Sequence, residues 1–231
     1  MSTVWFISDL HIGHSKVASH RADEAGITRT MVRNDCGLYE ADPEFDVRWH
    51  DTSLAEHWDA VVGRDDVVHV LGDISSGTDK AQRNALEWLS ERPGRKRLKY
   101  GNHDGPHDMN RDSAKYWRMY AESEVFEDMR LHGRMRIPLS HGHAEVLLSH
   151  FPYVGDRGPD RHTQWRLPNE GLPIIHGHTH SQERVSYGTS LPTDEPGGWF
   201  RPVQINVAPE AWDRHPVHIS EISAILQYEK V

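Results

Sequence analysis

The feature that most constrains this chain is a repeated pattern in which a short apolar run ends in a polar motif. Five separated motifs end a predicted strand in this way, four of them after an apolar run, and they carry Asp9 and His11, Asp73, Asn102, His150, and His178 and His180. Short apolar runs bounded by turn-forming residues are typical of buried strands. Each motif is therefore expected where a strand gives way to a loop, which is where metal-binding and catalytic side chains commonly lie.

Strand and helix patterns alternate along the chain, which favours an α/β fold. Three predicted strands lead directly into motifs, namely residues 3–8, 66–71 and 96–100. Helical apolar spacing is found at about 52–62, 79–91 and 112–121, and again from about Ser220. Further strands are predicted at 184–187 and 200–207, and residues 125–149 are expected to form hairpin strands that turn near residues 140–142. Without a repeat or linker, residues 1–231 are expected to form a single domain.

Composition limits the cellular compartment and the kinds of binding partner that we expect. A single cysteine, Cys36, cannot form an internal disulfide, and the first strand follows Met1 too closely for an export leader. No apolar run approaches the roughly 20 residues that span a bilayer. We therefore expect a cytoplasmic protein without a membrane partner. The formal charge of −9 disfavours binding nucleic acid through a broad basic face, although it leaves a locally positive cleft open.

The first two motifs are ambiguous when taken singly. Asp9 and His11 are two apart in an extended chain, so their side chains share a face and could hold one ion. Gly72-Asp73 supplies a second carboxylate, and the glycine permits close backbone approach. Each of these motifs is equally consistent with a solvated strand end.

Two later motifs are more specific. Gly101-Asn102-His103-Asp104 places an amide oxygen, which is a neutral ligand, beside an imidazole that can donate a proton. The run from His176 to His180 has imidazoles at alternate positions, where protonated rings would repel and a metal ion is the natural partner. Most of the 18 histidines must still be structural or exposed, because a metal site uses only a handful.

Together and in this order, the motifs resemble the calcineurin-like metallophosphoesterase superfamily. Its pattern of Asp-x-His, Gly-Asp, Gly-Asn-His-Asp/Glu, an isolated His and Gly-His-x-His is matched from residue 9 to residue 180. The tail around Asn206 to Trp212 also looks like a small bacterial and phage branch of that superfamily. The resemblance implies a four-layer α/β/β/α sandwich of two mixed β-sheets flanked by helices, with the site at shared strand ends.

The resemblance also implies two divalent metal ions, with Asp73 bridging them. One ion would be held by Asp9, His11, Asp73 and His180, and the other by Asp73, Asn102, His150 and His178. A shell of nitrogen and oxygen donors without thiolates favours Mn, Fe, Zn, Ni or Co over Mg or Ca. Manganese is our expectation among these.

The implied activity is metal-dependent hydrolysis of a phosphoester, as a phosphodiesterase or a phosphatase. A hydroxide bridging the ions would attack phosphorus in line, and His103 would donate a proton to the leaving group or stabilise the transition state. We favour a phosphodiesterase acting on a small, nucleotide-like or generic phosphoester. The alternatives are a nuclease on single-stranded DNA or RNA, which the acidic balance disfavours, and an inactive metal-binding scaffold, which the complete ligand set disfavours.

Five further residues are candidates for contacting substrate or supporting the ligands: His14, Asp104, His176, Arg157 and Arg161. For the histidines and arginines, a packed or solvated role is the alternative interpretation. The two arginines lie in residues 151–172, which, with residues 15–50, form long segments that follow metal motifs and are expected to cover the cleft.

One position departs from the family pattern. Many relatives carry a charged residue three positions after the bridging aspartate, in several cases orienting the catalytic histidine, and here that residue is Ser76. His103 is therefore expected to be oriented by Asp104 or not at all.

Overall fold

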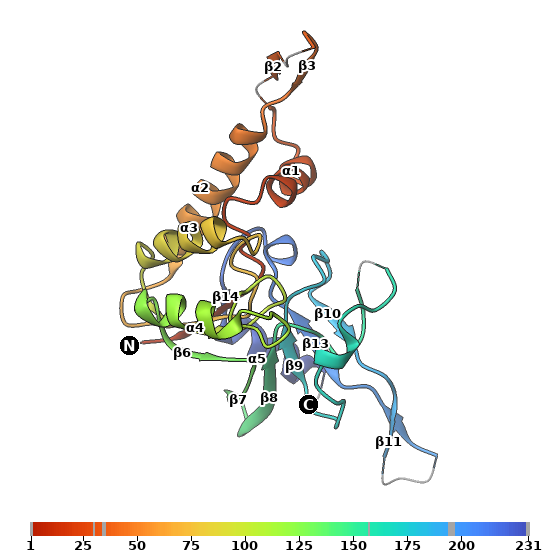
Figure 1. Ribbon diagram of the computed structural model, residues 1–231. Coiled ribbons are helices and arrows are strands. Elements are labelled where there is room, and N and C mark those ends of the chain that lie inside the picture. The colour runs from red at the N-terminus through yellow and green to blue at the C-terminus, as the bar shows by residue number, and fades with distance from the viewer. Residues whose placement is uncertain (1, 30, 34–35, 157, 194–196, 230–231) are drawn as a thin grey trace.

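Two five-stranded sheets form the centre of the molecule (Figure 1). The computed structural model describes residues 2–29, 31–33, 36–156, 158–193 and 197–229. The first sheet has the order β14-β1-β4-β5-β6 and the second the order β10-β13-β9-β8-β7. The first contains β1 (Val4–Ile7), β4 (Val67–Val70), β5 (Arg95–Lys99), β6 (Phe126–Arg130) and β14 (Val217–His218). The second contains β7 (His132–Pro138), β8 (His143–Ser149), β9 (Ile174–His176), β10 (Val185–Tyr187) and β13 (Val203–Asn206).

Both sheets are mixed. In the first, β1, β4, β5 and β6 run parallel to one another, and β14 is antiparallel to β1. In the second, β9 is parallel to both β8 and β13, whereas β7 and β10 add antiparallel edges. Parallel strands buried on both faces read as continuous apolar runs, which explains why β1 and β4 were visible in the sequence.

Helices cover the outer face of the first sheet. They are α2 (Pro43–Val61), α3 (Asp79–Ser90) and α4 (Ser113–Glu122). Trp58 of α2 and Leu89 of α3 are fully buried in one core cluster with Val68 and Leu98 of the sheet. The apolar stripes predicted for these helices are therefore the faces that they bury.

A second core cluster fills the space between the sheets. Phe6 of β1 packs there with Val146 and Ile205 of the second sheet, and the cluster includes Ile222 of α5 (Ile219–Tyr228). Helix α5 contacts β14, β1 and β7. The predicted fold class, two mixed β-sheets flanked by helices, is confirmed.

Two predictions about local structure were wrong. Helix α2 begins at Pro43 rather than near residue 52, because Asp42 caps it by accepting a hydrogen bond from the backbone N–H of Glu44. Strand β6 is not part of a hairpin but pairs in parallel with β5 in the first sheet.

The segment 15–50 also contains more structure than its weak periodicity suggested. It forms α1 (Ser15–Glu24), a two-stranded ribbon of β2 (Met31–Arg33) and β3 (Tyr39–Ala41), and the start of α2. The ribbon projects from the top of the molecule in Figure 1. A second ribbon pairs β11 (Leu191–Pro192) with β12 (Trp199–Phe200), and short 3-10 turns, η1 (Thr163–Trp165) and η2 (Pro209–Ala211), lie in loops. Within the described residues, no helix is long and apolar enough to cross a membrane.

Candidate metal centre

The seven predicted ligands all follow strand ends. Asp9 and His11 come after β1, Asp73 after β4 and Asn102 after β5, which are parallel neighbours in the first sheet. His150 follows β8, and His178 and His180 follow β9, which is parallel to β8 in the second sheet. The backbone N–H of Ser8 donates to the carbonyl of Val207 across the sandwich, at 3.2 Å. The carboxyl ends of five strands thus meet at one place.

The backbone at this junction adopts an unusual conformation. Five of the seven candidate ligands have a positive φ: Asp9 (50°), His11 (47°), Asp73 (55°), His178 (70°) and His180 (48°). A non-glycine residue seldom adopts this left-handed conformation, and it persists where the surrounding structure imposes it, typically at functional sites. The strand ends therefore turn sharply at the residues that carry the candidate ligands.

Glycines in the motifs make room for the carboxylates. A Cβ on Gly177 would lie 2.2 Å from Oδ2 of Asp9, and a Cβ on Gly101 would lie 2.2 Å from Oδ1 of Asp73. Both distances are far shorter than any van der Waals contact. The two carboxylates therefore pack directly against the backbone of neighbouring motifs, which only glycine permits.

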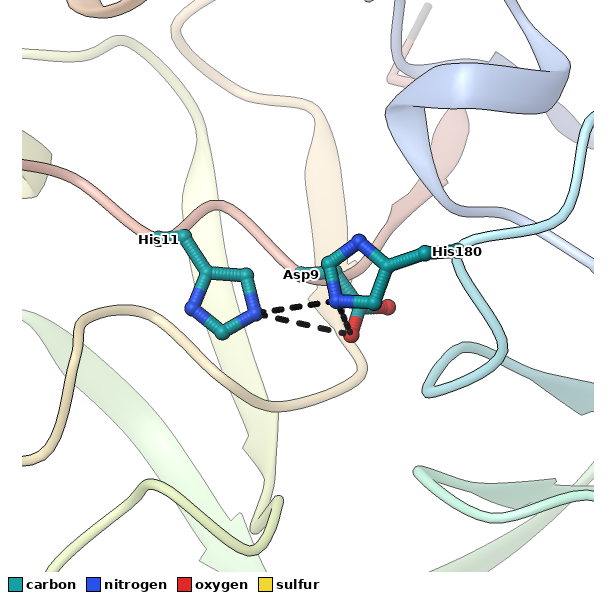
Figure 2. Close-up of side chains that lie close together, drawn as sticks. All are labelled: Asp9, His11 and His180. Atoms are coloured by element: carbon teal, nitrogen blue, oxygen red, sulfur yellow. Dashed lines mark hydrogen bonds and ion pairs between the residues drawn. The ribbon is translucent and has the colours of Figure 1, made fainter. Parts of the chain in front are cut away.

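Asp9, His11 and His180 converge in one group (Figure 2). The Nε2 atoms of His11 and His180 are 3.2 Å apart, and they lie 4.0 and 3.7 Å from Oδ1 of Asp9. Oδ2 of Asp73 lies 3.8 Å from Nε2 of His11. The structure therefore brings together the four residues expected to hold one ion.

A second group adjoins the first through Asp73. Oδ2 of Asp73 is 3.5 Å from Nε2 of His150, which in turn is 3.2 Å from Oδ1 of Asn102. The ring centroids of His150 and His178 are 5.2 Å apart. The same Asp73 oxygen faces both His11 and His150, so Asp73 is shared by the two groups.

Each of the four candidate histidine ligands has its outer ring nitrogen occupied by an acceptor. The pairs are His11 Nδ1 with the Ser75 carbonyl (3.1 Å), His150 Nδ1 with the Leu71 carbonyl (2.8 Å), His178 Nε2 with Asp156 (3.1 Å) and His180 Nδ1 with Glu210 (2.7 Å). An acceptor on the outer nitrogen fixes the tautomer and leaves the other nitrogen for an ion. The site thus presents Nε2 of three rings and Nδ1 of His178.

Asp156 and Glu210 were missed as site residues by sequence reasoning. Asp156 lies in a loop 22 residues before His178, and Glu210 is in η2, 30 residues after His180. No local pattern links either pair, although Glu210 lies within the tail that resembles the phage branch. Both carboxylates are about 1% exposed. They therefore act inside the protein, directly behind the candidate ligands.

Glu210 belongs to a buried network that reaches the first motif. Nε of Arg21 donates to Glu210 at 2.9 Å, while Nη2 of Arg21 donates to the backbone carbonyl of Asp9 at 2.8 Å. Burial alone would raise the pKa of Glu210, but Arg21 and His180 hold it well below its usual range. The network therefore keeps a carboxylate behind His180 and ties it to the strand end that carries Asp9.

The protonation states of three candidate ligands, His11, His178 and Asp73, suit metal binding. Burial lowers the pKa of His11 well below its usual value and that of His178 to about 3, so both rings are neutral. Burial would raise the pKa of Asp73, but the neighbouring His150 and His103 lower it, which keeps the carboxylate charged. Burial likewise opposes protonation of His150, although Asp73 and Asp9 outweigh this and raise its pKa.

One buried atom tests whether a cation fits here. Oδ1 of Asp9 is buried and has no hydrogen-bond partner, while Oδ2 accepts from the backbone N–H of His178 at 2.9 Å. A buried charged oxygen without a partner is costly, and a coordinated cation removes that cost. Oδ1 faces the inner nitrogens of His11 and His180. The donors present therefore fit a divalent ion.

His103 lies beside the cluster. Its backbone N–H donates to Oδ1 of Asp73 at 2.7 Å, and its ring centroid is 5.4 Å from that of His11 and 6.4 Å from that of His14. His14 is half-buried, and its ring is 5.3 Å from His11. Both rings therefore border the His11 side of the candidate centre.

Asp104 does not orient the His103 ring. Its carboxylate accepts hydrogen bonds from the backbone N–H groups of Asp73 (2.9 Å), Ile74 (3.1 Å) and Gly101 (2.7 Å). Burial, followed by repulsion from Asp73, raises the pKa of Asp104 to about 6. Asp104 therefore fastens together the loops that carry Asp73 and Asn102.

The remaining candidates lie outside the ligand groups. His176 is buried at the end of β9, its Nδ1 is 2.8 Å from the carbonyl of Gly177, and burial lowers its pKa to about 4. Arg161 donates to Asp156 at 2.8 Å, so it supports the carboxylate behind His178. Arg157 lies outside the described residues.

Comparison with known proteins agrees with this geometry. The sequence model of the family described as calcineurin-like phosphoesterase matches residues 2–182. The chain is 52% identical over 189 residues to the Gene 66 protein of Mycobacterium phage L5, covering 78% of this chain and 79% of the relative. It is 49% identical over 214 residues to the Gene 66 protein of Mycobacterium phage D29, covering 92% and 90%.

A solved structure shares the fold. A protein of unknown function from Aquifex aeolicus superposes with a TM-score of 0.58 at 20% identity, covering 97% of this chain and 100% of that chain. At this identity the likeness concerns the fold alone. The family match spans all five motifs, and the structure gathers them at one strand-end junction. The chain belongs to the calcineurin-like phosphoesterase family.

Proposed function

We propose that the protein is a phosphodiesterase that uses two divalent metal ions, with manganese as its native metal. The observation that carries this proposal is the unpartnered, buried Oδ1 of Asp9, which faces imidazole nitrogens whose outer partners are already in place. Asp73 supports a site for two ions, because one of its oxygens faces both His11 and His150.

The assignment of ligands follows from the two groups. Asp9, His11, Asp73 and His180 would hold one ion, and Asp73, Asn102, His150 and His178 the other. When bound, two such ions supply an acidified water as nucleophile and neutralise charge on the phosphoryl oxygens. The protein contributes fixed donor geometry, through glycines that admit the carboxylates and acceptors that hold the imidazoles.

His103 is our candidate for the proton donor to the leaving group. The backbone hydrogen bond to Asp73 sets the position of His103, and its ring borders the side of the cluster formed by His11 and His14. Among the described side chains, none makes a hydrogen bond with the His103 ring. The ring is thus available to a leaving oxygen, which is the requirement for a general acid.

The engaged arginines favour a diester over a monoester. Arg161 is paired with Asp156, and Arg166 donates to the backbone carbonyls of Pro152 and Gly155. Arg21 is buried against Glu210. A phosphomonoester dianion gains from an additional cation, whereas a diester carries one negative charge. Each of the three arginines described near the cluster already donates to a protein acceptor, which supports the singly charged substrate.

Reloading the metal-free protein tests the proposal. Chelated protein would be reloaded with Mn, Zn, Ni, Fe or Mg and assayed on a generic phosphodiester, a phosphomonoester, 2′,3′-cyclic nucleotides and single-stranded DNA. Among these metals and substrates, we expect the highest kcat/KM for Mn-loaded protein acting on a small phosphodiester. Asp73→Asn should abolish turnover, while Asp65→Asn, at an exposed loop position, should not change it.

The panel also separates the alternatives. Faster, salt-dependent cleavage of single-stranded DNA would replace the proposal by a nuclease. The absence of turnover with every metal and substrate, in protein shown to bind metal, would instead indicate a scaffold.

A further inference from the structure

The loop after His150 is folded around one buried carboxylate. Asp156 accepts from Arg161 through both Nη2 (2.8 Å) and Nε (3.1 Å) while contacting His178 at 3.1 Å. The side chain of Arg166 is only 4% exposed, and it donates to the carbonyl of Gly155 at 3.2 Å. These bonds tie the loop to His178, a candidate metal ligand. The other side chains of the loop are therefore held in fixed positions beside the cluster.

His162 is the residue that this loop presents to the site. It has φ 57° and ψ 28°, a left-handed conformation that few non-glycine residues adopt. Its carbonyl accepts from the backbone N–H of Trp165 at 2.9 Å, which begins η1. The conformation is therefore imposed by the folded loop, and strain of this kind concentrates where side chains bind ligands.

The His162 ring borders the second group of candidate ligands. Its centroid lies 5.6 Å from Phe151 and 5.8 Å from His178. The imidazole is half-buried, and neither ring nitrogen has a hydrogen-bond partner among the described residues. Unlike Arg161 beside it, which is committed to Asp156, His162 has its donor and acceptor available.

We propose that His162 is a substrate-binding residue that donates a hydrogen bond to a non-bridging oxygen of the phosphoryl group. This role rests on the function proposed above, since it requires a phosphoryl group at the metal cluster. His103 borders the cluster at His11, whereas His162 borders it at His178. The two imidazoles therefore differ in role, with His103 serving the leaving group and His162 holding the phosphoryl group.

Two substitutions separate the hydrogen bond from the backbone conformation. Glycine adopts a positive φ freely, so His162→Gly keeps the loop while removing the donor. Asparagine tolerates the same conformation and retains an N–H donor, so His162→Asn is the conservative variant. His141, exposed in the turn between β7 and β8, offers a matched control as His141→Gly.

The readout is binding of inorganic phosphate to Mn-loaded protein by calorimetry, together with KM and kcat for a phosphodiester. A hydrogen bond to a charged oxygen contributes about 1.5 to 3 kcal/mol, so His162→Gly should raise both the dissociation constant and KM by roughly 10- to 150-fold. The value of kcat should change less, because the contact is present before the transition state. His162→Asn should lie closer to the wild type, and His141→Gly should match it.

The role of His162 would be overturned if a His162→Gly variant that binds two Mn ions kept the phosphate affinity and the KM of the wild type. So would a Mn-loaded wild type that does not bind phosphate. A wild type that binds phosphate more tightly than His162→Gly, yet hydrolyses no ester, would uphold the role of His162 while refuting the phosphodiesterase.

Discussion

The Glu210 carboxylate lies 2.7 Å from Nδ1 of His180, on the side of the ring away from Asp9. Arg21 holds the same carboxylate at 2.9 Å. A carboxylate behind a histidine ligand fixes the ring and makes its inner nitrogen a better donor. Glu210 and Arg21, which lie outside the sequence motifs, therefore support the site that is expected to hold one ion.

Glu210→Gln should weaken binding of one of the two Mn ions by roughly 10- to 100-fold, the usual cost of losing such a partner. The amide keeps the size of the side chain but loses the charge that faces His180 and Arg21. Calorimetric titration of metal-free protein with Mn measures the effect, with Glu183→Gln, at an exposed position, as the matched control. Equal affinities for the two variants would show that Glu210 only packs.

Asp9→Asn should remove most of the stabilisation that Mn gives to the fold. Oδ1 of Asp9 is buried without a hydrogen-bond partner, so the metal-free wild type buries a carboxylate oxygen at a cost that the uncharged amide reduces. We expect the variant to melt at least as high as the wild type in EDTA and to gain little on adding Mn, whereas the wild type gains substantially. Thermal denaturation in both conditions tests this.

Asp65→Asn changes an exposed aspartate and is the control for removing one negative charge. It should follow the wild type in EDTA and in Mn. An Asp9→Asn protein that shows the full Mn-dependent rise would contradict the assignment of Asp9 as a ligand.

Local patterns located the residues that the structure gathers at the strand ends, because β1, β4, β8 and β9 contain short apolar runs just before them, whereas β5 is largely basic. The alternate imidazoles at His178 and His180 and the glycine between His176 and His178 belong to the same short stretch, so one local pattern describes them. Partners such as Asp156 were invisible, since their contacts depend on how a long loop folds back. Strand β6 was misassigned for a similar reason: strands look alike locally, and its pairing with β5 follows from the intervening α4.

His103→Ala should keep the fold and both metal ions but lose at least about 10²-fold in turnover, the lower end for general acid catalysis. The ring makes no hydrogen bond within the described protein, so its removal leaves no buried group unpaired. Metal content and kcat on a phosphodiester provide the test, with His141→Ala as the control. Near-normal turnover would refute the assignment.

The stability of the metal-free protein should depend on pH through His69. This residue is buried in β4, stacks on Phe6 with ring centroids 5.5 Å apart, and has no partner for Nδ1. Burial, and then the nearby Lys99 and Arg97, lower its pKa from 6.5 to about 4. Between pH 6.5 and about pH 4, the His69 imidazole is protonated in the unfolded chain but not in the folded protein. The free energy of unfolding must therefore fall as pH decreases through this window.

His69→Phe preserves an aromatic ring against Phe6 and removes this titration. Relative to the wild type, the variant should gain about 2 kcal/mol in free energy of unfolding when the pH is lowered from about 7.5 to about 5. Urea denaturation in EDTA measures it, because the chelator removes any contribution from bound metal. His141→Phe, at an exposed position, should give a curve parallel to the wild type. A parallel curve for His69→Phe as well would mean that His69 is protonated, or unprotonated, equally in both states.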